Sequence, residues 1–376
     1  MTSILVIGMV DSIHTAHWIE RIVDKDLSIE IMPSRNYRRI HPLLVDIINE
    51  NRNVIFKNKF LTFKLSPYID YAKNLMFGFI GKNRSSILEK MLQKKEYDYI
   101  HALEIQHAGY MLLGVELEAH KNATLILTNW GSDIYYFAQF PEHEVRIRKL
   151  LAKIDRYSAE CSRDYELASQ LGFHGKFMKV VPNSYSFSEP LGSVHRASER
   201  NQIICKTYGG EFGLGLLIIE SARKVLELNS TIEFFFYSVT KDLESKIEDL
   251  ISSYPRRVRY STVRNPLSHN ALLGEFSNSR IYVGASRSDG ISTSFLEAMS
   301  QGSYPIQTNT SCASDWIAKG CVGSVVGTTQ NEILNAILQA LYDDERVNLA
   351  QAENLRILQT ETRFQDLSAV AKTFYR

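Results

Sequence analysis

Short, continuous runs of apolar residues recur along this chain, and longer amphipathic stretches separate them. Because side chains alternate between the two faces of a strand, a run that is apolar throughout suits a strand buried on both faces, as in a parallel sheet. Such runs occur at 4–8, 99–103, 124–128, 178–181, 203–206, 233–237, 258–261, 280–283 and 304–307. Helical patterns lie between them at 16–23, 215–228, 241–251, 294–300 and 331–343. The alternation predicts an α/β fold with doubly wound sheets.

The length of the chain predicts two domains, because 376 residues exceed what one ordinary core holds. A polar stretch rich in turn-forming residues at 182–201 is typical of a domain boundary. We therefore predict an N-terminal domain over 1–185 and a C-terminal domain over 186–355. The last segment, 356–376, is expected to form a helix that packs back on the N-terminal domain.

The composition excludes several classes of protein. Lys and Arg number 43 against 42 Asp and Glu, so the chain lacks the basic excess of a general nucleic-acid binder. Its four cysteines form no C-x-x-C pair, which argues against a metal site or disulfide scaffold and favours a reducing compartment. The first residues have no basic region, and Asp11 interrupts their apolar run, so we expect a strand rather than a signal peptide. No run reaches the roughly 18 apolar residues of a membrane span, and we expect a cytoplasmic protein.

The stretch 286–302 is the most informative for function. A Gly/Ser/Thr-rich loop follows the strand expected at 280–283 and opens a helix, with Ser292 or Thr293 as the N-cap. The free amides and dipole of such a helix start suit an anion such as a diphosphate. Asp289 precedes the helix and Glu297 lies about one turn inside it, so the two carboxylates could hold hydroxyls at two ends of one ligand. On this pattern alone, a capped helix with a surface acid is the favoured interpretation.

The same stretch resembles the donor-site signature of retaining glycosyltransferase family four, which has the GT-B fold. That signature is an acid, seven residues, Glu, then Ala-Met, a small residue and Gly. Asp289 and Glu297 have this spacing, with Asp in place of the commoner Glu, and Ala298, Met299 and Gly302 match. The resemblance implies two Rossmann-like domains that face a central cleft.

The resemblance also implies roles for individual residues. Glu297 would hold the ribose hydroxyls of the donor, and Asp289 the hydroxyls of its hexose. Backbone amides would hold phosphate and sugar at Gly290, Ile291, Ser292, Thr293 and Ser294.

Weaker similarities to this family lie in the first half, so that the resemblance covers about 3–345. The stretch 128–133 resembles a T-x-H-G-x-D turn, which implies a catalytic role for Asp133. The stretch 98–101 resembles a D-x-V-H strand leading to the catalytic cleft, which ends here at His101. Leu103 replaces a second His of the family, so His107 is a further candidate, although a lone His is more often structural. Gly8 lies where the family places a Gly-rich loop facing the donor.

The residues that neutralise the diphosphate depart from the family pattern. The family has a Gly-Arg strand end and a Lys-Gly helix start, whereas in the matching stretch, 203–214, only Lys206 is basic. Glycines such as Gly209 still let the backbone approach a phosphate. Arg287 and Arg264 are candidates for the missing positive charge.

By this resemblance the protein moves a hexose from a nucleotide diphosphate sugar, commonly UDP-linked, to a glycan or lipid-linked acceptor, with retention of configuration. The pathway implied is bacterial surface polysaccharide synthesis. We expect no cofactor and no metal, because the D-x-D at 24–26 directly follows the first helix, too early for a metal site of that kind. Two alternatives stay open: a nucleotide-sugar epimerase of the same fold, and a non-catalytic glycan-binding or partner subunit, which the reduced basic pair favours.

The segment 51–95 has an uneven charge. Ten basic residues stand against two acidic ones there, and seven aromatic residues are interleaved. The pattern is typical of a solvated face over core aromatics. It also fits a surface that rests on anionic lipid, which would place the enzyme peripherally at the inner face of the membrane.

Overall fold

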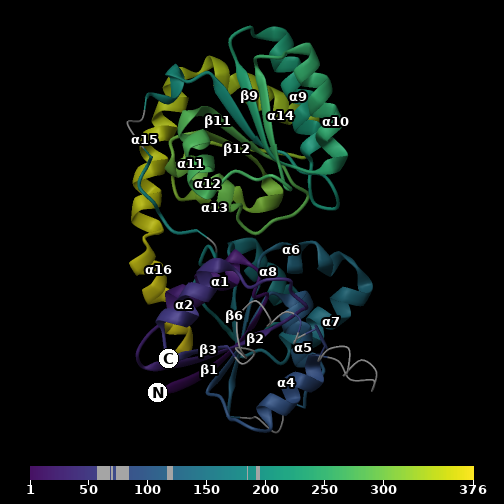
Figure 1. The fold of residues 1–376 in the computed structure, drawn as a ribbon, viewed down its shortest axis with the longest axis vertical. Coiled ribbons are helices and arrows are strands. Elements are labelled where there is room, and N and C mark those ends of the chain that lie inside the picture. The colour runs from purple at the N-terminus through teal and green to yellow at the C-terminus, as the bar shows by residue number, and fades with distance from the viewer. Residues whose placement is uncertain (57–67, 69–70, 73–83, 117–121, 184, 192–194) are drawn as a thin grey trace. The chain divides into compact units, whose positions relative to one another are not determined.

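The chain folds into two compact units, seen in a computed structural model that describes residues 1–56, 68, 71–72, 84–116, 122–183, 185–191 and 195–376. Unit 1 comprises Met1–Ser184 together with Phe364–Arg376, and unit 2 comprises Tyr185–Arg363. Each unit has its own sheet with helices packed on it (Figure 1).

Unit 1 contains a seven-stranded parallel sheet in the order β3-β2-β1-β4-β5-β6-β7. Its strands are β1 (Thr2–Gly8), β2 (Leu27–Pro33), β3 (Val54–Phe56), β4 (Tyr99–Leu103), β5 (Thr124–Thr128), β6 (Arg156–Ser158) and β7 (Lys176–Phe177). Its described α-helices are α1 (Ile13–Ile22), α2 (Pro42–Glu50), α4 (Arg84–Leu92), α5 (Tyr110–Leu113), α6 (Ser132–Tyr135), α7 (Pro141–Leu151), α8 (Ser162–Gln170) and α16 (Phe364–Lys372). A π-helical turn at Ile105–Gly109 joins β4 to α5.

Unit 2 contains a six-stranded parallel sheet in the order β10-β9-β8-β11-β12-β13. Its strands are β8 (Gln202–Lys206), β9 (Glu233–Val239), β10 (Val258–Thr262), β11 (Ser279–Gly284), β12 (Tyr304–Thr308) and β13 (Ser324–Val326). Its α-helices are α9 (Gly215–Leu228), α10 (Lys241–Ser253), α11 (His269–Asn278), α12 (Thr293–Ser300), α13 (Ala313–Ala318), α14 (Gln330–Tyr342) and α15 (Asp344–Glu361).

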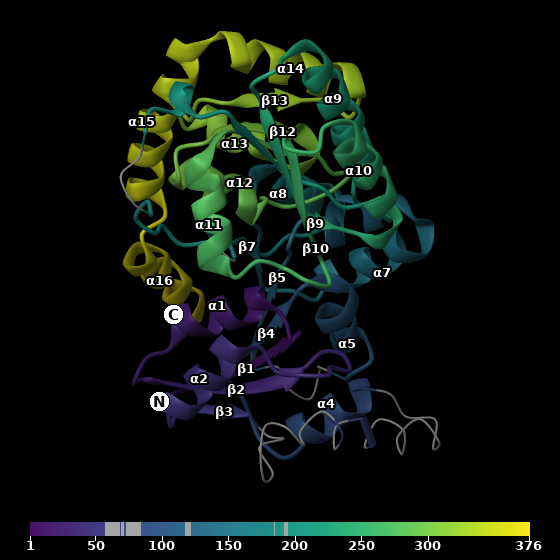
Figure 2. The same ribbon diagram turned by 45° about the horizontal axis from the view of Figure 1, so that its top comes forward.

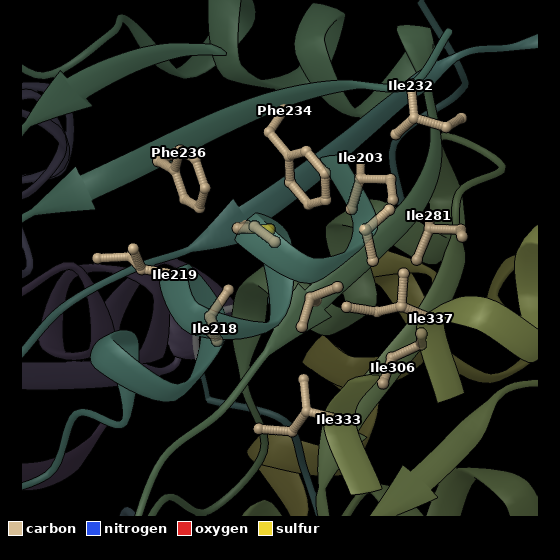
Figure 3. Packing of buried hydrophobic residues seen from close by; sticks show 14 of the residues in the cluster. Ile203, Ile218, Ile219, Ile232, Phe234, Phe236, Ile281, Ile306, Ile333 and Ile337 are labelled. Atoms are coloured by element: carbon tan, nitrogen blue, oxygen red, sulfur yellow. The ribbon is translucent and has the colours of Figure 1, made fainter. Parts of the chain in front are cut away.

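The sheet of unit 2 has a core on each face, because alternate residues of its strands point in opposite directions. Ile203 of β8 belongs to the core under α9, α10 and α14, whereas its neighbour Ile204 belongs to the core under α11, α12 and α13. Figure 3 shows the first core, where Ile203 and Ile281 of the strands lie with Ile218 and Ile333 of the helices. The two sets of helices lie on opposite sides of the strands (Figure 2). This arrangement confirms the prediction of doubly wound α/β domains.

The last helix of the chain, α16, packs on unit 1 beside α1 (Figure 1). The Ser368 hydroxyl donates a 2.6 Å hydrogen bond to the Arg21 carbonyl, and Lys372 forms a 3.0 Å ion pair with Asp24. Phe374 and Tyr375, just beyond the helix, are buried in the core of unit 1. The preceding helix, α15, belongs to unit 2.

One strand prediction was wrong, and the strands β2, β3, β6, β7 and β13 were not predicted. The stretch 178–181 is not a strand, because the amides of Met178 and Val181 reach the carbonyls of Tyr157 and Ala159 without a regular register, and β7 lies just before it. The sequence did not predict β2 because Glu30 interrupts its apolar pattern. None of the described helices combines the length and hydropathy needed to cross a bilayer.

Candidate functional site

In unit 2 the chain leaves two neighbouring central strands in opposite directions. From β8 it passes to β9 on one side, and from β11 it passes to β12 on the other. Loops diverge at the carboxyl ends of two such strands, and open α/β sheets bind their ligands in the crevice between them. The loops after β8 and β11 contain most of the donor-site residues predicted from the sequence.

These two loops pair directly with each other. Gly213 and Ser286 form an antiparallel bridge, and the amide of Arg287 donates a 2.7 Å hydrogen bond to the carbonyl of Phe212. A side chain at position 213 would collide with the backbone, because a Cβ there would lie 2.0 Å from the carbonyl oxygen of Tyr208. At Gly209 a Cβ would lie 2.0 Å from the carboxylate of Asp242, an exposed side chain that would have to move aside.

The loop that leads into α12 is polar and its helix start is uncapped by side chains. Ser292 is the N-cap residue, as predicted, but its side chain makes no capping hydrogen bond. The Ser288 hydroxyl is buried without a hydrogen-bond partner among the described residues, while the Ser286 and Ser292 hydroxyls adjoin the phenols of Tyr208 and Tyr282. Buried polar groups normally have partners, so an unsatisfied hydroxyl beside a helix N-terminus favours a ligand-binding loop. Asp289 lies in this loop and accepts a 2.9 Å hydrogen bond from the Gly290 amide.

The other residues predicted on this loop have mixed exposure. Ile291 and Ser294 are buried, and Thr293 is half-buried. Tyr208, on the loop after β8, lies close enough that burial, together with the Asp289 carboxylate, raises the pKa of its phenol. Tyr208 therefore brings a large polar side chain to the same crevice, which the sequence analysis did not recognise.

Glu297 lies one turn into α12 with 13% of its side chain exposed. Its carboxylate oxygen Oε1 lies 2.7 Å from Nε2 of His269, the first residue of α11. The hydrogen bond to Glu297 raises the pKa of His269 above its ordinary value, against the opposing effect of burial. No motif marks His269 in the sequence, because the contact joins two helices whose pairing depends on the fold.

Two of the three predicted basic residues lie at this crevice. The Lys206 ammonium lies 5.6 Å from the centre of the Tyr208 ring, at the end of β8. The exposed Arg287 side chain donates a 3.3 Å hydrogen bond to the Gly213 carbonyl. Arg264 is exposed on the loop after β10, which leads to His269, and makes no hydrogen bond or ion pair with the described part of the chain.

Unit 1 has a corresponding crevice between β1 and β4, where the chain again departs in opposite directions. Gly8 ends β1, and a Cβ there would lie 3.0 Å from the Thr15 hydroxyl, so a larger residue would press on α1. The Ser12 side chain caps α1 by accepting a hydrogen bond from the His14 amide. The His14 ring stacks on Trp130, with 4.7 Å between ring centres.

Glu104 is the residue at this crevice that the sequence analysis missed. It follows β4 with a φ of +77°, a strained conformation for a residue with a side chain. Its buried carboxylate accepts hydrogen bonds from the amides of Gln106, His107 and Ala108. The same carboxylate lies 3.3 Å from Nδ1 of His107, whose side chain is 44% exposed. Glu104 thus orients the solvent-accessible imidazole of His107. Its position directly after a predicted central strand could have marked it in the sequence as a candidate site residue.

Asp133 is buried and supports the same turn. Its carboxylate accepts hydrogen bonds from the amides of Ile105, at 3.1 Å, and Trp130, at 2.8 Å. Burial, with the nearby carboxylates of Glu104 and Asp164, raises the pKa of Asp133 to about 8. These contacts are those of a positioning residue for the turn that carries His107, whereas the sequence predicted a catalytic role for Asp133.

His101 is fully buried in β4. Its Nδ1 lies 2.7 Å from the Tyr375 hydroxyl, and its Nε2 lies 2.8 Å from the Thr128 hydroxyl. Burial lowers the pKa of its imidazole to about 3, so the ring is neutral at ordinary pH. Both ring nitrogens of His101 are thus engaged by side chains inside the core, whereas the sequence predicted a catalytic role for this residue.

Comparison of the whole chain with solved structures identifies the class of fold. Sucrose-phosphate synthase from Thermosynechococcus elongatus aligns with a TM-score of 0.71 and 13% identity, covering 100% of this chain and 98% of that one. The Anabaena protein HepE, solved in complex with UDP and glucose, aligns with a TM-score of 0.69 and 12% identity, covering 100% and 99%. Trehalose-6-phosphate synthase from Burkholderia multivorans aligns with a TM-score of 0.69 and 11% identity, covering 100% and 95%. The fold is therefore GT-B, as predicted.

Sequence comparison adds a family relationship for the first half. Residues 3–159 match the family model described as Glycosyl transferase 4-like. No curated protein matches the sequence. The family match and the GT-B fold together support a glycosyltransferase.

Proposed function

We propose that this protein transfers a hexose from a nucleotide diphosphate sugar, with UDP as the nucleotide, to a glycan or lipid-linked acceptor. The observation that carries the proposal is the crevice between β8 and β11, where Asp289 and Glu297 lie on either side of the α12 N-terminus. This is where a doubly wound domain binds a nucleotide. The neighbour HepE was solved with UDP and glucose bound, which supports the same class of donor.

In this proposal unit 2 binds the donor. Glu297, held by His269, accepts hydrogen bonds from the ribose hydroxyls, and Asp289 accepts them from the hexose. The amides of Ile291, Ser292, Thr293 and Ser294 and the α12 dipole face the diphosphate, beside the Gly290 amide, which donates to the Asp289 carboxylate. Lys206 and Arg287 add positive charge beside it. These groups stabilise the leaving diphosphate as the glycosidic bond breaks.

Unit 1 binds the acceptor in this proposal, with His107 as the group that contacts the reactants. The Glu104 carboxylate orients the His107 ring, and Asp133 holds the turn that carries both. Gly8, at the end of β1, is the glycine that the family resemblance assigns to a donor-facing loop. The reaction proceeds with retention at the front face of the sugar and without a protein nucleophile, and it serves bacterial surface polysaccharide synthesis.

Release of UDP from a panel of UDP-sugars, measured with and without candidate acceptors, tests the proposal. We expect release that depends on the acceptor and on one of the sugars. Conversion of a UDP-sugar without acceptor would instead favour the epimerase. A non-catalytic subunit would bind glycan or partner but release no UDP with any sugar, and this outcome would overturn the proposal.

We further propose that the enzyme works in the cytoplasm, peripherally at the inner face of the membrane, through segment 51–95. Most of its charged and aromatic side chains, among them Lys57, Lys59 and Lys64, lie outside the described residues. Each basic residue near an anionic bilayer contributes roughly 1 kcal/mol. Flotation with anionic vesicles should therefore decrease with added salt and on changing these three lysines to Glu. Wild-type protein that ignores anionic vesicles at low salt would contradict this localisation.

A further inference from the structure

The loop that joins β2 to α2, residues 34–41, lies at the carboxyl edge of the unit 1 sheet. The Ser34 amide donates a 2.9 Å hydrogen bond to the Gly8 carbonyl, and the His41 amide donates one of 2.9 Å to the Val10 carbonyl. These two bonds place the 34–41 loop directly against the loop that follows β1. The 34–41 loop therefore borders the crevice between β1 and β4.

The 34–41 loop is strongly basic. It contains Arg35, Arg38, Arg39 and His41, and no acidic residue occurs between positions 31 and 45. Arg38 and Arg39 are exposed and make no hydrogen bond or ion pair with any described residue. Arg35 forms a 3.2 Å ion pair with Asp11, which lies on the loop after β1.

Further positive charge reaches the 34–41 loop from neighbouring elements. Arg84 of α4 donates hydrogen bonds of 2.9 Å to the Pro33 carbonyl and 2.7 Å to the Asn36 side chain. His17 of α1 faces His41 and is paired with Glu20 at 3.0 Å. Burial, and then the charges of His17 and Arg39, lower the pKa of His41, which is consistent with cations gathered around one point.

Several polar groups on the 34–41 loop are buried and unsatisfied. The Ser34 hydroxyl, on a residue only 4% exposed, has no hydrogen-bond partner among the described residues. The same holds for Nδ1 of His41 and Nε of Arg35. The helix α2 starts directly after His41 and has no side-chain cap, so its first amides are free of side-chain acceptors. Unsatisfied polar groups and an uncapped helix start on one basic loop together favour the binding of an anion.

We propose that the 34–41 loop binds a phosphate group of the acceptor, with Arg38 and Arg39 as its main ligands. This inference rests on the proposed function in that it assigns the phosphate to the acceptor. Arginine presents a fork of donors that matches phosphate oxygens, and two exposed arginines in succession, without a partner among the described residues, suit a dianion better than a single carboxylate. The acceptor is thus a phosphorylated sugar or a lipid-linked phosphate, which share this chemistry.

Binding to the full-length protein without any donor tests the site. The variant Arg38→Gln/Arg39→Gln removes both guanidiniums. The control Lys149→Gln/Lys153→Gln removes the same charge from exposed positions at the end of α7 in the same unit. Calorimetry with inorganic phosphate and with a hexose 6-phosphate should show saturable binding to the wild type and the control. We expect the arginine variant to lose on the order of tenfold or more in affinity, with unchanged circular dichroism.

Vesicles distinguish the two sources of phosphate. Binding to a hexose 6-phosphate that depends on the two arginines supports a soluble phosphorylated sugar. If flotation with phosphatidylglycerol vesicles depends on the two arginines, and the hexose 6-phosphate binds only weakly, the results support a lipid-linked phosphate. Equal losses in the arginine variant and the lysine control, or no saturable phosphate or vesicle binding by the wild type, would overturn the proposal.

Phosphate binding is measured without a nucleotide sugar, so its outcome does not depend on whether the protein transfers a sugar. If phosphate binding depends on the arginines but no UDP-sugar is turned over, the anion site stands and its assignment to an acceptor falls with the proposed function. If UDP is released while phosphate binding is absent, the anion site alone is overturned.

Discussion

His101 and His107 follow one another along the chain, but their surroundings assign them different tasks. The His101 ring is closed inside the core between Tyr375 and Thr128, where a proton cannot reach it without breaking a hydrogen bond. The His107 ring is accessible to solvent, and its Nδ1 lies 3.3 Å from the Glu104 carboxylate. Residue type alone does not separate these roles, because a His in a strand and a His in the following turn differ chiefly in what packs around them.

Glu297→Ala should abolish tight nucleotide binding. A carboxylate that accepts ribose hydroxyls makes charge-assisted hydrogen bonds, and losing such a partner costs about 2–3 kcal/mol. Calorimetry with UDP measures this loss directly. Glu220→Ala, an exposed position on α9, serves as the matched control. Unchanged UDP affinity in the Glu297 variant would show that the ribose lies elsewhere.

The contact between His269 and Glu297 should give unit 2 a pH dependence. Since the hydrogen bond raises the pKa of His269 above 6.5, the charged pair stabilises the fold fully below that value and is lost as pH rises through the folded pKa. His269 should therefore titrate above its ordinary range when followed by proton NMR. Glu297→Gln should move that titration downward. An unchanged pKa of His269 in the Glu297→Gln variant would disprove the ion pair.

Among the secondary-structure elements, β2 and α16 show how distant partners stabilise segments that their own residues do not define. Glu30 is buried in β2, and its carboxylate accepts a 2.7 Å hydrogen bond from the Tyr97 hydroxyl and pairs with Lys95 at 3.1 Å. A buried acid is tolerated only with such partners. The segment after α16 is held in the same way, because the Arg156 side chain donates a 2.6 Å hydrogen bond to the Phe374 carbonyl.

Tyr375→Phe should destabilise unit 1 by about 1–3 kcal/mol. The Tyr375 hydroxyl accepts a 2.9 Å hydrogen bond from the Trp18 indole and lies 2.7 Å from the His101 ring. Its removal therefore leaves two buried polar groups without a hydrogen-bond partner. Urea unfolding of the full chain reports the change. Tyr342→Phe, with 77% of that residue exposed, should leave the unfolding midpoint unchanged. Equal effects of the two substitutions would mean that the buried network contributes nothing.

For the protein as an enzyme, transfer should survive removal of divalent metal ions. The α12 N-terminus, Lys206 and Arg287 supply the positive potential that a leaving diphosphate requires. Transfer assayed in EDTA should proceed at the untreated rate. Complete loss in EDTA, with recovery on adding manganese, would show that a cation shares the donor site.

The features recognisable in the sequence were local ones. The strand at Tyr99–Leu103, the helix at Gly215–Leu228 and the acid pair around the start of α12 depend on side-chain periodicity and spacing within a few residues. The doubly wound architecture followed from their order. These properties could be predicted because neighbouring residues specify them through backbone geometry, whatever the rest of the chain does.

The features that define how the candidate site works came from contacts between distant segments. His269 and Glu297 lie 28 positions apart, and His101 and Tyr375 lie 274 apart. The pairing of the loops after β8 and β11, and the strained turn by which Glu104 holds His107, likewise required the packed sheet. The burial, orientation and pKa of a side chain depend on the groups that the fold brings next to it. A local sequence pattern does not specify which distant residues those are.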